Sequence, residues 1–188
     1  MGRWEPNARG RLEKAALELY SERGFEQTTV AEIAKRAGLT ERTFYRHFAD
    51  KREVLFPDAS PLQTFFVEAL NDAPHDAAPI DTVGLALDRI GELFQGRREL
   101  ARQRQGIVSA NPELREREVT KMADLSDAAA RTLRGRGVGD LAASLAAEIA
   151  VAVLKVAFER WLDDPGDRDF GHFARESLDE VRALAAGA

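Results

Sequence analysis

Residues 40–51 read TERTFYRHFADK, and this stretch decides how the N-terminal part of the chain is interpreted. Phe44 and Phe48 lie four residues apart, so on a helix they share one face. The rest of the helix surface then carries threonines, arginines, a tyrosine and a histidine. This segment is too short and too polar for an ordinary core helix. We therefore expect its outer face to contact a partner that is rich in hydrogen-bond acceptors.

The residues around Gly38 predict two short helices joined by a tight turn. One helix is predicted over residues 29–37, capped by Thr29, and the other over residues 40–48. This spacing is typical of a helix-turn-helix, whose second helix enters the major groove of DNA. Arginine side chains can pair there with guanine, and hydroxyl groups reach phosphates.

Helical periodicity covers nearly all of the remaining chain, and strand signals are almost absent. Asp50 is predicted to cap a short helix over residues 51–56, with Glu53 answering it in a capping box. Longer helices are predicted over residues 8–23, 61–70, 83–96, 97–110, 111–135, 140–162 and 170–185. The predicted fold class is all-α with about nine helices, and proline-containing breaks place a boundary near residue 57.

Composition and charge are consistent with a DNA-binding head on an acidic body. The 188 residues are 44% hydrophobic and 31% charged, and they include no cysteine. Residues 1–56 carry 11 Lys and Arg against 9 Asp and Glu, net +2, whereas residues 57–188 have a net charge of −7. Such an asymmetry orients the N-terminal part toward a polyanion. Because no signal peptide and no apolar run near the length of about 20 residues is seen, we expect a cytoplasmic protein without a membrane partner.

A longer run, ALELYSERGFEQTTVAEIAKRAGLTERTFYRHFADKREVL, begins at Ala16 and ends at Leu55. It resembles the DNA-binding domain of the tetracycline-repressor (TetR) family in its G-F before T-T-V, its I-A-x-x-A-G turn and its T-F-Y-x-H-F motif. The resemblance is close over residues 11–56 and extends beyond them only in the pattern of helices. It implies a three-helix DNA-binding domain at 1–56 and a helical effector-binding and dimerisation domain at 57–188.

By position, the resemblance implies two groups of DNA-binding residues. The operator-reading group is Thr40, Glu41, Arg42, Tyr45 and Arg46. The phosphate-binding group is Thr28, Thr29, Thr43, His47 and Lys51. Each of two residues also has a purely structural interpretation. In this interpretation Tyr45 is a core aromatic that extends its hydroxyl to solvent, and His47 is a structural histidine.

The resemblance also implies a ligand cavity in the C-terminal domain. The apolar candidates for its lining are Phe65, Phe66, Leu70, Leu87, Ile90, Phe94, Ile107, Met122 and Leu125. Their large apolar side chains suggest a small, apolar effector, although the same residues would also serve as ordinary core. Four nearby arginines at positions 97, 98, 102 and 104 are more simply interpreted as a solvated face than as an anion site.

The predicted helix over residues 140–162 is apolar on two faces, so we expect burial on two sides. One face has no partner within the chain, and pairing with residues 170–185 across a two-fold axis would give a four-helix interface. That symmetry matches a palindromic operator in double-stranded DNA. The prediction is a homodimeric, ligand-responsive repressor. The alternative is a helical small-molecule-binding protein without operator activity.

No catalytic or metal-binding arrangement is predicted. The chain has no cysteine, no Glu-x-x-His pair and no phosphate-binding glycine loop. Asp72 with His75 and Asp169 with His172 have helical i, i+3 spacing, but a proline and a glycine between them disfavour a shared helical face. We therefore predict no enzyme activity, no cofactor and no metal site.

Overall fold

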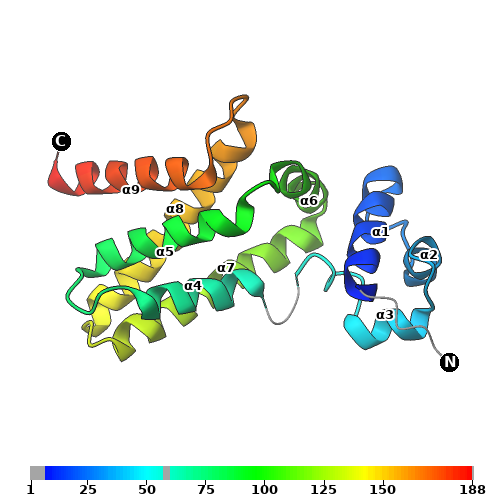
Figure 1. The fold of residues 1–188 in the computed structure, drawn as a ribbon, viewed down its shortest axis with the longest axis horizontal. Coiled ribbons are helices and arrows are strands. Elements are labelled where there is room, and N and C mark those ends of the chain that lie inside the picture. The colour runs from blue at the N-terminus through cyan, green and yellow to red at the C-terminus, as the bar shows by residue number, and fades with distance from the viewer. Residues whose placement is uncertain (1–6, 57–59, 188) are drawn as a thin grey trace. The chain divides into compact units, whose positions relative to one another are not determined.

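The computed structural model describes residues 7–56 and 60–187. Over these residues the chain forms nine helices and no strand, which confirms the predicted fold class (Figure 1). The contacts divide the chain into two compact units. The head contains residues 7–56 and Arg102–Glu118, and the body contains residues 60–101 and 119–187. The break expected near residue 57 falls mainly on residues 57–59, which lie outside the described residues.

The three N-terminal helices of the head end where their capping residues predict. Gly24 and Gly38 take left-handed φ angles of 89° and 67°, which a residue with a Cβ rarely adopts. Thr29 and Thr40 accept hydrogen bonds from backbone N–H groups at the starts of the second and third helices. These helices are α1 (Ala8–Arg23), α2 (Val30–Arg36) and α3 (Glu41–His47).

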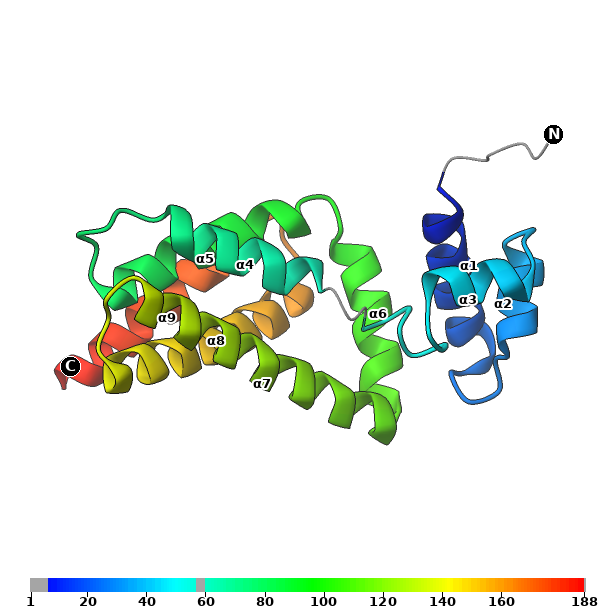
Figure 2. The ribbon, with the colours of Figure 1, turned by 90° about the horizontal axis from the view of Figure 1, so that it is seen from below.

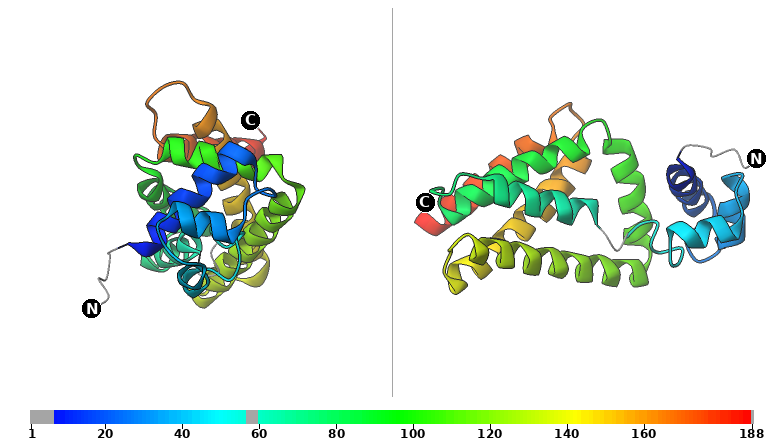
Figure 3. Two further views of the ribbon diagram at one scale, coloured as in Figure 1. Left: turned by 90° about the vertical axis from the view of Figure 1, so that its right-hand side faces the viewer. Right: turned by 60° about the horizontal axis from the view of Figure 1, so that its bottom comes forward.

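The core of the head includes residues that are distant in sequence. Phe44 of α3 and Phe48, which caps the end of that helix, are both buried, as predicted, and their ring centroids lie 5.3 Å apart. Ile107, Val108 and Leu114 belong to the same hydrophobic cluster. They come from the end of α6 (Arg98–Ala110) and the start of α7 (Pro112–Gly135), which meet at a corner in Figure 3. We call residues 102–118 the elbow, and it completes the core of the head.

The prediction of a short helix over residues 51–56 is wrong. These residues form successive turns, although the Asp50 carboxylate does accept the N–H groups of Arg52 at 2.7 Å and Glu53 at 3.2 Å. The second half of the predicted capping box is absent because the buried Glu53 carboxylate pairs with Arg117 of the elbow. A tertiary ion pair therefore overrides the local capping signal.

The body is built around α8 (Asp140–Asp163), which packs against α5 (Pro79–Phe94) and α9 (Phe170–Ala186). Helix α4 (Pro61–Asp72) packs on α5 (Figure 2). Two ion pairs show that α5 and α9 are antiparallel. Asp81 near the start of α5 pairs with Arg182 near the end of α9 at 2.6 Å, and Asp88 further along α5 pairs with Arg175 nearer the start of α9 at 2.7 Å. A Cβ at Gly91 would lie 3.4 Å from the backbone nitrogen of Gly171, in van der Waals contact with the start of α9.

Helix α8 is long and apolar enough to cross a membrane, and its best window has a mean hydropathy of 2.0. This finding corrects the expectation that no segment approaches that length and hydropathy. One such helix is weak evidence for a membrane segment, because a core helix passes the same test. Within the body, Ala143, Ala147, Ala150, Val153 and Ala157 of α8 are all buried.

Arg98, at the start of α6, contacts backbone carbonyls, so the interpretation of the four arginines as a solvated face is wrong for Arg98. Arg98 donates to the backbone carbonyls of Asp164, Gly166 and Arg168, and its guanidinium lies 5.3 Å from the centroid of the Trp161 ring. Arg104 pairs with Glu118 at 3.0 Å within the elbow. The first arginine fastens α6 to the loop between α8 and α9.

Candidate nucleic-acid interface

Helix α3 separates a buried face from an exposed polar face. Phe44 is fully buried and Phe48 is 3% exposed, whereas Tyr45 is 57% exposed. The Tyr45 ring lies edge-on to Phe44, with ring centroids 5.6 Å apart. This exposure argues against the interpretation of Tyr45 as a core aromatic.

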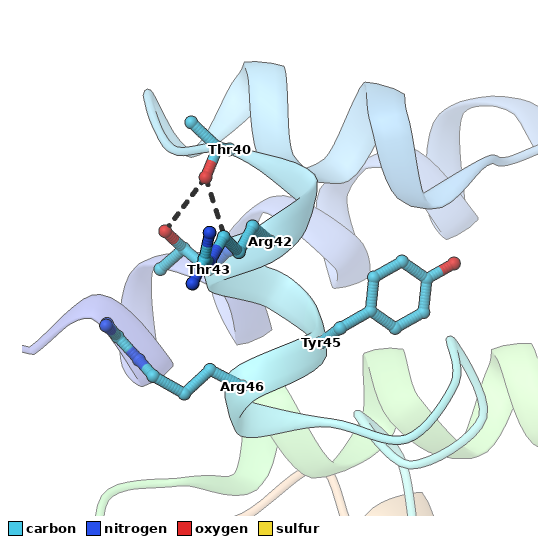
Figure 4. A pocket seen from close by; sticks show the side chains of 5 residues that line it. All are labelled: Thr40, Arg42, Thr43, Tyr45 and Arg46. Carbon is cyan, nitrogen blue, oxygen red and sulfur yellow. Dashed lines mark hydrogen bonds between the residues drawn. The ribbon is translucent and has the colours of Figure 1, made fainter.

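The exposed face of α3 carries polar side chains that have no hydrogen bond or ion pair to the described part of the chain. These side chains belong to Glu41, Arg42, Tyr45 and Arg46. An open depression is lined by Thr40, Arg42, Thr43, Tyr45 and Arg46, and Figure 4 shows Arg42, Tyr45 and Arg46 projecting outward from the α3 ribbon. Two guanidinium groups and a phenol are thus available to an external partner.

Thr40 and Thr43 are bound to each other at the start of α3. Their hydroxyl oxygens lie 3.0 Å apart, and the Thr43 N–H donates to the Thr40 hydroxyl at 3.2 Å (Figure 4). This arrangement caps the helix, while Thr40 remains exposed. A hydroxyl rotates and has two acceptor lone pairs, so the pair retains capacity for an additional hydrogen bond.

Three residues of the predicted phosphate-binding group are already engaged within the head. The buried Thr28 hydroxyl lies 2.9 Å from the Gly24 carbonyl oxygen and 3.4 Å from that of Leu19. The Thr29 hydroxyl lies 3.0 Å from the Glu32 carboxylate, and hydrogen bonds from Thr29 lower the pKa of Glu32. The Lys51 ammonium donates to three backbone carbonyls.

His47 differs from these residues because its Nε2 atom is buried and has no hydrogen-bond partner. Its ring lies 6.4 Å from the Phe48 ring, centroid to centroid. A buried polar atom without a partner is destabilising. The His47 imidazole is therefore not a structural histidine whose hydrogen bonds are satisfied within the protein.

Two arginines that the sequence did not single out support the helix-turn-helix. Arg11 of α1 donates to the carbonyl of Ala37, at the turn between α2 and α3. Arg36 pairs with Glu22 at 2.8 Å and with Glu18 at 3.4 Å. The hydrogen bond from Arg36 lowers the pKa of Glu22. Neither contact leaves a local sequence signal, because the partners lie on separate helices.

The proposed ligand-binding residues divide between the two units. Five of them are buried in the hydrophobic core of the body and three pack against it: Phe66, Leu70, Leu87, Ile90 and Leu125, then Phe65, Phe94 and Met122. Ile107 packs in the core of the head, so it lies in a different cluster from the other eight. Phe94 also contacts the rings of Phe158, Trp161 and Phe170, at centroid distances of 5.0–5.4 Å.

The two aspartates considered as metal ligands have other roles. The Asp72 carboxylate pairs with Arg89 at 2.7 Å, and the Asp169 carboxylate accepts the His172 N–H at 2.8 Å as the cap of α9. Over residues 7–56 and 60–187, no group of three or more His, Cys, Asp or Glu side chains could hold a metal ion.

Two family models match the chain. The model of bacterial regulatory proteins of the tetR family matches residues 12–56, and the MftR C-terminal domain matches residues 77–186. The transcriptional regulator TcmR of Streptomyces glaucescens is 32% identical over 155 residues, which cover 78% of this chain and 68% of that protein. The chain therefore belongs to the tetR family of bacterial regulatory proteins.

Solved structures share the fold. FadR from Bacillus subtilis, in complex with stearoyl-CoA, superposes with a TM-score of 0.61 at 21% identity, covering 92% of this chain and 96% of that one. SmeT, the repressor of the Stenotrophomonas maltophilia multidrug efflux pump SmeDEF, has a TM-score of 0.62 at 22% identity, covering 94% and 89%. SmeT has also been solved as a triclosan complex. The protein described here is a transcriptional regulator with a DNA-binding helix-turn-helix.

Proposed function

We propose that this regulator is a cytoplasmic repressor, which binds a palindromic operator as a homodimer and leaves it when a small apolar effector binds. The observation that carries the proposal is the exposed face of α3. Its arginines and the Tyr45 hydroxyl have no hydrogen-bond or ion-pair partner among the described residues, while the opposite face is buried in the core of the head. A recognition helix needs this division between an anchored face and a free face.

The residue types on that face suit base recognition in the major groove. Arg42 and Arg46 can each donate two hydrogen bonds to the O6 and N7 atoms of guanine. Glu41 can accept from the amino group of cytosine, and the Tyr45 ring can pack against a thymine methyl group. Thr29, Thr40 and Thr43 remain proposed phosphate contacts, together with His47, through groups at the starts and flank of the two helices.

Dimerisation is supported by a largely exposed apolar stripe on α8. The stripe comprises Leu141, Leu145, Ile149, Ala152 and Val156; Leu141 is 74% exposed, Leu145 55% and Val156 47%. On α9, Leu184 is 69% exposed. A second copy related by a two-fold axis would cover the same patch on both chains. The dimer would then present two recognition helices, one from each copy, to two half-sites.

An apolar effector would bind among the eight ligand-binding candidates of the body, of which five are buried in its hydrophobic core and three pack against that core. Both FadR with stearoyl-CoA and SmeT with triclosan bind ligands with apolar portions in a related fold. A signal can reach the head along continuous helices, because α6 and α7 each have one part in the body and the other in the elbow. Of the prolines at the predicted boundary near residue 57, Pro57 lies outside the described residues and Pro61 is the first residue of α4.

The proposal is tested by selecting duplexes from a random DNA library with the full-length protein. We expect an inverted repeat whose half-site centres are separated by about 10–10.5 base pairs or a multiple of this distance. Enrichment of no sequence above the starting library would refute operator binding. That result would favour the alternative, a helical small-molecule-binding protein without operator activity.

Effector action is tested on the selected duplex by calorimetry. An effector that weakens operator binding by about 1–3 kcal/mol must itself bind more weakly, by the same factor, when operator is present. Lauroyl-CoA and triclosan are suitable first probes, because related structures hold these molecules. A probe with equal affinity for free and DNA-bound protein is not the effector that releases the operator.

A further inference from the structure

Lys51 matches the position of a phosphate contact, yet its ammonium group is fully engaged inside the head. Its Nζ atom donates to the carbonyl oxygens of Phe25 at 2.8 Å, Thr28 at 3.0 Å and Glu26 at 3.2 Å. An ammonium group has three donors and no acceptor. All three donors therefore point to the loop between α1 and α2.

Two further contacts fix Lys51 in this place. Its Nζ atom lies 4.4 Å from the centroid of the Phe25 ring, within the range of a cation–π interaction. Its backbone carbonyl accepts the phenol of Tyr20 at 2.7 Å. Tyr20 is buried and packs edge-on against Phe25, with ring centroids 5.1 Å apart. Both the backbone and the side chain of Lys51 are thus tied to the end of α1 and the loop that follows it.

These contacts join two segments whose relative position matters for DNA recognition. Lys51 follows the end of α3 by four residues, and the loop of Phe25, Glu26 and Thr28 leads directly into α2. We infer that Lys51 is a positioning residue, which fixes the orientation of α3 against α1 and α2 and makes no contact with DNA phosphate. This inference rests on the proposed operator binding.

The chemistry of the side chain explains why lysine occupies this position. A tetrahedral ammonium directs its three donors to three converging carbonyl oxygens, whereas the planar guanidinium of arginine is a fork suited to carboxylate or phosphate. Turning toward a phosphate would break three charge-assisted hydrogen bonds, each stronger than a neutral one. A lysine that served only as a phosphate contact would be replaceable by arginine; a lysine that positions α3 is not.

The two roles give opposite results on DNA. Loss of a phosphate contact weakens binding to all sequences about equally and lowers the slope of log affinity against log salt by about 0.9. Loss of a positioning contact misorients α3 and so weakens binding to the operator selectively. Non-specific binding and its salt slope then stay unchanged, because the contacts that neutralise phosphates are intact.

The test uses full-length Lys51→Met and Lys51→Arg, with Lys14→Met as the control. Lys14 is an exposed lysine on α1 that has no hydrogen bond or ion pair to the described residues. Affinity is measured by fluorescence anisotropy over a range of salt, on a duplex selected by the wild type and on a scrambled duplex of equal length. All measurements are made at a temperature where circular dichroism shows every variant to be folded.

We expect both Lys51 variants to lose on the order of tenfold in affinity for the selected duplex, the equivalent of about one charge-assisted hydrogen bond. Affinity for the scrambled duplex and both salt slopes should match the Lys14→Met control. Wild-type affinity in Lys51→Arg would overturn the inference, as would an equal loss on both duplexes with a lower slope. A lower melting temperature with both affinities intact would also overturn it, because Lys51 would then serve stability alone.

Amide hydrogen exchange tests the same inference without DNA. Residues 25–30 should exchange faster in both Lys51 variants than in Lys14→Met, since the loop loses its ammonium contacts. Unchanged exchange would overturn the inference whatever the DNA results. If the wild type selects no duplex, operator binding fails as the proposed function, and faster exchange that remains confined to this loop would assign Lys51 to stability alone.

Discussion

A charge introduced into the apolar stripe of α8 should separate the proposed dimer. Leu145 is 55% exposed near the middle of the stripe, between Leu141 and Ile149. In an interface with two-fold symmetry, the same residue is buried on both copies of the chain. Leu145→Glu therefore removes two apolar contacts and brings two carboxylates into the same interface.

The size of the effect follows from the exposed fraction. Complete burial of a leucine side chain is worth about 1.5–3 kcal/mol. Covering the exposed 55% of Leu145 on two copies then contributes about 2–3 kcal/mol. Its loss raises the dimer dissociation constant by about 30–150-fold. Burial of two like charges adds to this factor, so the estimate is a lower bound.

Sedimentation equilibrium over a range of concentrations measures that constant directly. Leu100→Glu is the matched control, because Leu100 is 50% exposed and lies on α6 outside the proposed interface. Leu145→Glu should weaken dimerisation and operator binding together, while Leu100→Glu should change neither. A wild-type dissociation constant in Leu145→Glu, with the fold preserved, would refute the assignment of the α8 stripe to the interface.

Three further predictions concern recognition and stability. Arg42→Ala and Tyr45→Ala should each weaken operator binding by about 1–3 kcal/mol without affecting a scrambled duplex; equal losses on both duplexes would argue against base contacts. Arg117→Met should destabilise the head by about 2–3 kcal/mol in urea denaturation, because it leaves the buried Glu53 carboxylate unpaired; we place the cost below the usual range because Arg117 is partly exposed. Adding Glu53→Gln to that variant should restore part of the loss, and no recovery would show that the pair is not the cause. Hydrogen bonding by Arg168 lowers the pKa of Asp164, so its contribution to stability is present above about pH 4 and lost as the pH falls through the lower folded pKa. Asp164→Asn should therefore melt at a lower temperature than the wild type at pH 7, and the difference should shrink as the pH falls below about 4; a constant difference would contradict this role.

Apart from the wrong helix over residues 51–56, the sequence was sufficient to predict the helices, because their signals are local. Glycines with left-handed φ angles end α1 and the turn after α2, and threonines cap α2 and α3. The apolar spacing of Phe44 and Phe48 identified the buried face of α3, and with it the exposed face. Each of these signals operates within about four residues, where helix geometry determines which groups meet.

The elbow could not be predicted in this way. Ile107 has the same apolar character as the ligand-binding candidates of the body, but it packs in the core of the head. Glu53 has the spacing of a capping residue, yet it pairs with Arg117, which lies 64 residues later. The occupied donors of Lys51 are likewise set by a loop more than 20 residues earlier. Periodicity and capping contain no information about such distant partners.

Hydroxyl-radical footprinting of the selected duplex, combined with the mass of the complex in sedimentation, tests operator binding by a dimer most directly. We predict two copies of the chain on one duplex and two protected segments on the same face of the DNA. Their centres should be separated by about 10–10.5 base pairs or a multiple of this distance, and Tyr45→Ala should lose both segments together. A single protected segment bound by one copy would contradict the dimeric repressor, and uniform protection along the duplex would contradict sequence recognition by α3.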